Sequence, residues 1–230
     1  MEQQLSAAFA HPAKEESLAE QAYRRIKLNI LNLTYAPGSD LTEARLSQEL
    51  DMSRMPVRMA MQRLEHEGWL TADFRKKTKV RAISRQDVAD LYEFRRLIEL
   101  PAMRRIFAQG KTWDYSFLME QGLLRIKACR HDLYSRERAE TDLHMAIVGV
   151  LGNQRINRIY QQAQDELIRI GLLFVTPEDR EEHYIDQIIA GWEQIILAVR
   201  ENREAEALAI FDHDHITGAL ALALKQIKEG

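Results

Sequence analysis

Two arginines at the start of a predicted helix have the residue type and the spacing to recognise a partner. Arg54 and Arg58 stand four residues apart, so they share one face of a helix predicted over residues 54–67. A guanidinium can donate two parallel hydrogen bonds to guanine O6 and N7, and a helix that enters the major groove contacts bases with its first residues. The spacing therefore favours recognition of double-stranded DNA.

The elements that must position these arginines form a helix-turn-helix. Leu46 and Leu50 lie one turn apart and are expected to face inward from a first helix over residues 42–50. Residues 51 and 52 leave room only for a tight turn. Ser53 then stands where a side-chain oxygen can cap the second helix by accepting backbone N–H bonds.

The second helix and the segment after it complete the motif. Its predicted buried stripe consists of apolar residues at helical spacing, Val57, Met61 and Leu64. Pro56 lies in the first turn, where a missing N–H costs little, and Gly68 is placed to end the helix. Short strands are predicted over residues 69–71 and 78–80, around a basic tip at residues 75–77. Because a β-hairpin with such a tip is a wing, we expect a winged helix-turn-helix.

A charged helix face also has a simpler interpretation, since most charged residues on a helix are only solvated. The order of helix, tight turn, basic helix and basic hairpin favours DNA binding over that alternative. The wing lysines are then expected to contact phosphates, which raises affinity and carries little sequence information. The residues expected at the DNA interface are Arg45, Ser53, Arg54, Arg58, Arg63, Arg75, Lys76, Lys77 and Lys79.

Composition and charge indicate a globular protein with a local basic segment. The chain has 230 residues, a net charge of −3 and 29% charged residues, which is ordinary for a soluble protein. Residues 53–81 contain eight basic and three acidic residues, and a local basic patch on an acidic chain is typical of DNA binding. Cys129 is the single cysteine, which excludes an intrachain disulfide. With no apolar run long enough to span a bilayer, we expect a cytoplasmic protein with no membrane partner.

The rest of the chain has helical periodicity. A loose tail is expected over residues 1–16, followed by a capped helix over residues 17–33. The inward stripe of that helix is predicted to be Ala22, Ile26, Ile30 and Leu33. After a hinge at residues 83–84, helices are predicted over residues 85–108, 114–133, 136–151, 156–174, 178–200 and 203–228. The predicted fold is mainly α, with a winged helix-turn-helix domain over residues 17–82 and an all-α antiparallel helical bundle over residues 83–230 whose interior could hold a ligand.

The first part of the sequence resembles the GntR family of transcriptional regulators. The resemblance rests on Ser-Arg-Met-Pro-Val-Arg at residues 53–58 and on Glu-Gly-Trp-Leu at residues 67–70. It implies a winged helix, a homodimer and a short palindromic operator, with Arg54 and Arg58 matching the family's base-reading arginines. Lys77 departs from the pattern, since the family usually has a glycine there, and its contact is expected to shift towards phosphate.

The second part is similar to the FCD effector domain of FadR-type members of that family. Residues 91–102, Leu-Tyr-Glu-Phe-Arg-Arg-Leu-Ile-Glu-Leu-Pro-Ala, resemble the opening helix of that domain, and His144 followed by Gly152 and Asn153 resembles a second landmark. The resemblance thus covers nearly the whole chain. It implies that the bundle binds a small carboxylate effector, which many members hold through a divalent metal on one aspartate and three histidines.

Carried over residue by residue, that ligand set is only partly retained. Glu140 stands at the aspartate position and His144 at the first histidine position, and their four-residue spacing puts both on one helix face. Trp192 replaces the second histidine and offers no lone pair to a metal. The last histidine falls at Asp214 by ungapped counting, or at His215 if the register shifts by one. Two outcomes stay open: a site for one zinc, nickel or manganese ion on the remaining ligands, or a metal-free pocket filled in part by Trp192.

Arg95 matches a family position that faces the effector carboxylate, and a buried guanidinium can hold a carboxylate through two parallel bonds. The alternative is a salt bridge to Glu99, one turn later on the same predicted helix. The residues expected around the effector are Arg95, Glu140, His144, Trp192, Asp214 and His215.

These patterns predict a DNA-binding regulator, in this family usually a repressor, whose operator affinity is modulated by a bound carboxylate. The alternative is a regulator with a degenerate, metal-free pocket that responds to a different ligand or to none. An enzyme is not predicted, because the sequence has no nucleophile-and-base arrangement, no His-Glu-x-x-His pair and no glycine-rich phosphate loop.

Overall fold

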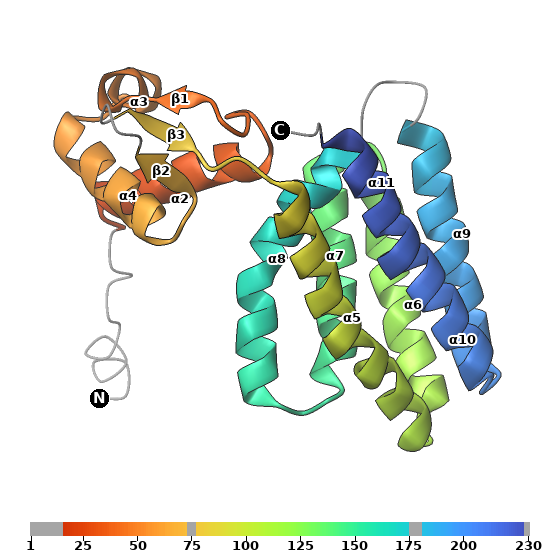
Figure 1. Cartoon of the computed structure of the whole chain (residues 1–230). Helices are drawn as coiled ribbons and strands as arrows, with labels where there is room; N and C mark the ends of the chain where they lie inside the picture. The colour runs from red at the N-terminus through yellow and green to blue at the C-terminus, as the bar shows by residue number, and fades with distance from the viewer. Residues whose placement is uncertain (1–15, 73–76, 175–180, 228–230) are drawn as a thin grey trace, which may run out of the picture. The chain divides into compact units, whose positions relative to one another are not determined.

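A computed structural model describes residues 16–72, 77–174 and 181–227, and the chain divides into two units with the boundary between Ala82 and Ile83 (Figure 1). Most of the tail predicted over residues 1–16 lies outside the described residues. The elements of the first unit are α2 (Leu18–Leu31), β1 (Asp40–Leu41), α3 (Glu43–Leu50), α4 (Arg54–His66), β2 (Leu70–Ala72) and β3 (Thr78–Val80). The strands form an antiparallel sheet in the order β1-β3-β2.

Local side chains explain where α3 and α4 begin and end. Thr42 caps α3 by accepting a hydrogen bond from the Arg45 backbone N–H at 3.2 Å. Asp51 then adopts a left-handed conformation with φ of 53°, which Asp tolerates better than most residues. Ser53 occupies the N-cap position of α4, but its side chain makes no capping hydrogen bond, so the predicted capping role of this hydroxyl was wrong. Gly68, with φ of 80°, follows the end of α4 as expected.

The apolar stripe predicted for α4 is confirmed, because Val57, Met61 and Leu64 are all buried. Ala22, Ile26 and Ile30 of α2 are fully buried as well. The fourth residue of that predicted stripe was placed wrongly: Leu33 lies beyond the end of α2 in a left-handed conformation with φ of 62°. The prediction also missed β1, a two-residue strand whose only signal is its pairing with β3.

The second unit is an all-α bundle, as the sequence predicted. Its described elements are α5 (Arg85–Ala108), α6 (Thr112–Ala128), α7 (Leu133–Gly149), α8 (Gln154–Phe174), α9 (Glu181–Arg200), α10 (Glu204–Ile210), a π-helical segment η2 (Phe211–Thr217) and α11 (Gly218–Gln226). The capping box that begins α5 is present, since the Ser84 hydroxyl and the Asp87 carboxylate each accept the other residue's backbone N–H. The helix predicted to start at residue 136 begins earlier because Asp132 caps it.

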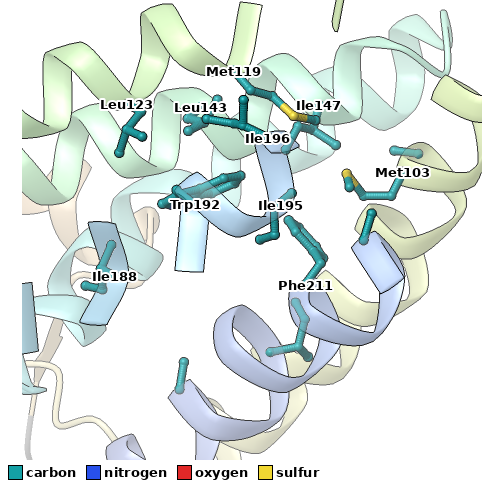
Figure 2. Close-up of a cluster of buried hydrophobic side chains, with 14 of the residues drawn as sticks. Met103, Met119, Leu123, Leu143, Ile147, Ile188, Trp192, Ile195, Ile196 and Phe211 are labelled. Carbon is teal, nitrogen blue, oxygen red and sulfur yellow. The ribbon is translucent and has the colours of Figure 1, made fainter. Parts of the chain in front are cut away.

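The core of the bundle lies between α5, α6, α7, α9 and the α10–η2 segment. Met103, Met119, Leu143, Trp192 and Phe211 meet there (Figure 2). α6 packs on α9 and α7, and α7 packs on α8. None of the helices in the described part of the chain is both long and apolar enough to cross a membrane.

Candidate nucleic-acid interface and ligand cavity

The exposed face of α4 carries Arg54 and Arg58, as the sequence predicted. Both side chains are exposed and lie one turn apart. Arg58 donates from Nε and Nη2 to the two carboxylate oxygens of Glu43 in α3, at 2.8 and 2.9 Å. These hydrogen bonds lower the pKa of Glu43. Because an exposed ion pair contributes only about 0–1 kcal/mol, the pairing orients the guanidinium and leaves it free to exchange to another acceptor.

Two other arginines expected at the DNA interface are held by carboxylates of their own unit. Arg63 donates to Glu67 at 2.9 Å and to Glu20 of α2 at 2.8 Å. Its guanidinium also lies 3.6 Å from the centre of the Tyr23 ring. Arg45 donates to a carboxylate one turn later in α3, at 2.6 Å. Arg63 therefore joins α4 to α2 within the unit, and its contact with DNA stays a prediction.

The structure describes both strands of the predicted wing, β2 and β3, and Lys77 next to β3. Lys77 and Lys79 lie on either side of the Asp40 carboxylate, with Nζ–oxygen distances of 3.9 and 3.8 Å. Lys79 is paired directly opposite Asp40 in the sheet. Arg75 and Lys76 lie outside the described residues. Strand β1 thus supplies an acidic neighbour for the basic hairpin.

The second unit contains a cavity of about 570 Å³ that is lined by α5, α7, α8, α9, η2 and α11. This volume lies in the range of small-molecule sites, about 300–1,000 Å³. The buried part of its lining includes Arg95, Glu137, His144 and His215, and Glu140 beside them is partly buried. Five of the six residues expected around the effector therefore line one cavity or its mouth, and the sixth, Trp192, lies behind the histidines.

Glu99 is fully buried and accepts hydrogen bonds from side chains of three helices, two of which, Arg95 and His144, line the cavity. Arg95 donates from Nε at 2.7 Å, Tyr160 of α8 donates its hydroxyl at 2.6 Å, and His144 Nδ1 of α7 lies 2.8 Å away. Burial acts to raise the pKa of Glu99, but Arg95 and His144 together hold it well below its usual value. Burial lowers the pKa of His144, and Glu99 offsets this only in part. The salt bridge that the sequence left as an alternative for Arg95 is therefore present, and Arg95 lines the cavity as well.

Glu140, His144 and His215 bring three possible metal ligands together. One donor atom from each lies within 4.8 Å of the others. The Glu140 carboxylate is 3.5 Å from His215 Nδ1 and 4.0 Å from His144 Nε2. Burial acts to raise the pKa of Glu140, but His215 and His144 hold it below its usual value. His215 Nε2 is buried and has no hydrogen-bond partner among the described residues.

The two residues predicted for the last ligand position differ in burial. His215 is buried beside Glu140, whereas the Asp214 side chain is exposed and accepts a hydrogen bond from His213 at 2.7 Å. Asp214 also lines the cavity but is not in the group of donors that lie within 4.8 Å of one another, and the choice between the two residues as a metal ligand stays a prediction. Both residues lie in η2, where hydrogen bonds span five residues instead of four and advance the register by one.

Trp192 fills the space beside these histidines. The side chain is 0% exposed, and its ring centre lies 4.3 Å from that of His215 and 5.1 Å from that of His144. It belongs to the hydrophobic core of the bundle. Its indole Nε1 has no hydrogen-bond partner among the described residues. An aromatic core residue therefore stands where the resemblance implies a fourth ligand.

Glu137 is a cavity residue that the sequence analysis missed. Its carboxylate is buried, lines the cavity and accepts a hydrogen bond from Arg136 at 3.2 Å. It fits because Gly171 of α8 has no side chain: a Cβ there would lie 2.1 Å from Glu137 Oε2. Burial, with Glu140 nearby, raises the pKa of Glu137 to about 7. The only sequence signal was its position three residues before Glu140 on one helix face.

Comparison with known proteins agrees with the division of the chain. Residues 18–80 match the family model of bacterial regulatory proteins of the gntR family, and residues 90–217 match the model of the FCD domain. The chain is 26% identical over 196 residues to the HTH-type transcriptional regulator YdhC of Bacillus subtilis, covering 84% of this chain and 88% of that protein.

Two solved structures have a similar fold over most of the chain. A GntR protein from Rhodococcus sp. RHA1 aligns with a TM-score of 0.68 and 18% identity, covering 93% of this chain and 100% of that one. McbR/YncC of E. coli aligns with a TM-score of 0.64 and 16% identity, covering 92% and 99%. At these identities the likeness shows the fold alone.

The raised pKa of Glu137 predicts a pH-dependent stability that Glu137→Gln removes. The folded wild-type protein holds the proton up to about pH 7, while the unfolded chain releases it near pH 4.3. The resulting stabilisation is complete below the unfolded pKa and is lost as pH rises through the folded pKa. Glu137→Gln has no proton to lose at this position. Its free energy of unfolding, measured relative to that of wild type, should therefore be roughly 2 kcal/mol higher at pH 7 than at pH 5.

Free energies of unfolding from denaturant titrations at both pH values measure this effect. Glu193→Gln, at an exposed carboxylate of the same bundle, is the matched control for replacing a glutamate. A wild-type-to-Glu137→Gln difference that is the same at pH 5 and pH 7 would contradict the raised pKa.

Proposed function

The chain belongs to the GntR family of bacterial transcriptional regulators and carries an FCD domain, and from this premise we propose that it is a repressor whose operator affinity falls when a small carboxylate binds in its helical unit. As a member of that family it is a DNA-binding regulator and not an enzyme. The observation that carries the proposal is the buried wall of the cavity, where Arg95 lies beside Glu140, His144 and His215.

On the DNA side, α4 supplies the base contacts and the wing supplies phosphate contacts. Arg54 and Arg58 lie in the first two turns of α4, the part of a recognition helix that reaches base edges. Arg58 exchanges its two bonds to Glu43 for bonds to a guanine, which keeps a bidentate acceptor on the guanidinium in both states. Ser53, Lys77 and Lys79 contact phosphates.

Regulators of this family are typically dimeric, and we propose a homodimer on a palindromic operator. Two copies place two α4 helices in successive major grooves, so the symmetry of the protein matches that of the DNA site. We further propose the domain division of the sequence prediction, a DNA-binding part up to residue 82 and an effector-binding part from residue 83.

The donor set of the cavity fits a divalent cation with three protein ligands. His215 has a buried nitrogen for which the described part of the chain offers no hydrogen-bond partner, and His144 has one nitrogen on Glu99, which orients the ring as in many metal sites. Glu140, His144 and His215 would hold the ion, with zinc, nickel or manganese the expected identities. Bound there, such an ion supplies positive charge and open positions for a carboxylate.

The protein's own residues explain how an acid is selected and how its binding reaches the DNA-binding part. Arg95 provides a buried positive group at the cavity wall, and its position is held by Glu99. Arg95 lies on α5, the helix that begins three residues after the boundary between the units. An effector that prefers one position of α5 shifts the equilibrium between arrangements of the dimer. The resulting change in operator affinity equals the coupling free energy between the effector site and the DNA-binding site.

The second candidate function is a regulator with a metal-free pocket that responds to a different ligand or to none. The fully buried Trp192 in place of a fourth ligand favours it. Binding of the operator in the presence of candidate effectors separates the two functions.

Small hydroxy- and sugar acids are expected to weaken operator binding, because their carboxylate can bind the Arg95 guanidinium. The operator is the duplex that wild-type protein selects from a randomised pool, and its binding is followed by fluorescence anisotropy. A coupling of about 1–3 kcal/mol predicts roughly 5- to 150-fold weaker binding. The amide of each active acid is the matched control and should have no effect. If no acid changes the affinity, the carboxylate proposal fails and the second candidate gains support.

Arg54→Ala and Arg58→Ala should each weaken binding to the selected operator roughly 10- to 100-fold and relax base preference at one position, because each removes a bidentate base contact. Arg104→Ala, at an exposed arginine of α5, is the matched control. Equal losses in all three variants would show that net charge, and not base contact, governs the affinity.

His215→Ala should lower metal affinity by on the order of 100-fold, whereas His213→Ala, two residues away and 82% exposed, should leave it unchanged. Isothermal titration with zinc, nickel and manganese after chelator treatment measures both. Trp192→His adds a fourth ligand and should tighten binding. Metal binding by Trp192→His and none by wild type would support the metal-free alternative.

A further inference from the structure

Two methionines stand in the middle of the DNA-facing side of α4. Met55 is 61% exposed and Met59 is 55% exposed, although both are large apolar side chains. Met61 of the same helix is only 7% exposed and packs in the core. The helix therefore carries methionines of two kinds, and core packing accounts only for Met61.

The exposed methionines form one surface with a base-reading arginine. Met55 and Met59 are four residues apart, and Arg58 lies between them at three residues from Met55, so the three side chains share a helix face. This face lies opposite the buried stripe that contains Val57 and Leu64. Met55 is the second residue of α4 and Met59 the sixth, which places both in the turns that reach furthest into a major groove.

The chemistry of the major groove offers one apolar group to such side chains. Of the four bases, only thymine presents a methyl group there, on C5, and apolar side chains contact it. Methionine is flexible and polarisable, so it adapts to the position of a methyl group without a fixed hydrogen-bond geometry. Exposed single apolar residues are common, but a pair on the base-reading face has this specific use.

We infer that Met55 and Met59 contact the 5-methyl groups of thymines adjacent to the guanines that Arg54 and Arg58 contact. The inference rests on the DNA-binding function and on the proposed role of α4. It assigns two further specificity-determining residues, and it makes thymine part of each half-site. The neighbouring charges favour DNA over a protein or a second copy as occupant, since Arg54 and Arg58 border the methionines and attract phosphate.

Replacing thymidine with deoxyuridine tests the contact, because it removes only the 5-methyl group and leaves base pairing intact. Each thymine of the selected operator is replaced in turn, and full-length wild type, Met55→Ala and Met59→Ala are titrated against every duplex. Removing a contact with one methyl group should weaken wild-type binding about three- to fivefold at one or two positions. The alanine variant that lacks the contact should bind the unmodified operator more weakly than wild type does. Its affinity should not fall further when the contacted thymidine is replaced with deoxyuridine.

Two controls separate methyl contact from other effects. Met→Leu at either position keeps an apolar side chain and should retain the preference for thymine over deoxyuridine. The slope of log affinity against log salt concentration should not change in the methionine variants, whereas Arg58→Ala, which loses a charged contact, should change it. Both methionines are exposed and alanine is a better helix former, so the alanine variants are expected to fold.

Three results would overturn the inference. Wild-type affinity could be unchanged at every deoxyuridine position, or both alanine variants could stay as sensitive to deoxyuridine as wild type. Sedimentation could also show that Met55→Ala and Met59→Ala change the oligomeric state, which would assign this face to a second copy. If no duplex is selected from the pool, the DNA-reading role of α4 fails first, and that failure is distinguishable from loss of the methyl contact.

Discussion

The buried ion pair between Arg95 and Glu99 is the interaction on which the helical unit depends. Removing one partner of such a pair leaves an uncompensated charge and costs about 3–5 kcal/mol, so Glu99 must keep the donors that reach it from α5, α7 and α8. When these helices are packed around the pair, Arg95 and His144 still face the cavity. The charge of the cavity wall is therefore set by the same contacts that hold the helices together, and a ligand that changes those contacts acts on the whole bundle.

Ion pairs in the first unit have the opposite property, because they are exposed. The bonds from Arg58 to Glu43 lie in water and contribute little to stability. The Glu43 carboxylate accepts two parallel hydrogen bonds from the Arg58 guanidinium. Another acceptor of the same geometry can replace this carboxylate at a small cost in free energy. Arg63, which bridges α4 and α2 and lies 3.6 Å from the centre of the Tyr23 ring, combines its ion pairs with packing on an aromatic ring. The two units thus use the same residue types for different purposes, and solvent exposure makes the difference.

Trp192 shows how packing and ligand chemistry compete for one position. A fully buried indole stabilises the core through its large apolar area, but it leaves a buried N–H without a partner among the described residues and removes a nitrogen ligand. The possible ligands that remain come from α7 and η2, and the tertiary fold brings one donor atom of each within 4.8 Å of the others. If a metal ion binds there, three protein ligands leave it more open coordination positions than four would.

The sequence by itself determined the features that depend on near neighbours in the chain. The start of α5 followed from the capping box at Ser84, and the inward and outward faces of α4 followed from apolar periodicity. The four-residue spacing of Glu140 and His144 also sufficed to place both on one face. Only the tertiary structure decided that His215 faces Glu140, because the π-helical turn that shifts the register leaves no trace in the hydrophobic period. It also decided that Glu137 lines the cavity, because the space for its carboxylate is provided by a glycine on another helix. Contacts between residues far apart in the sequence leave no repeating pattern in it, because these residues meet only when the chain folds.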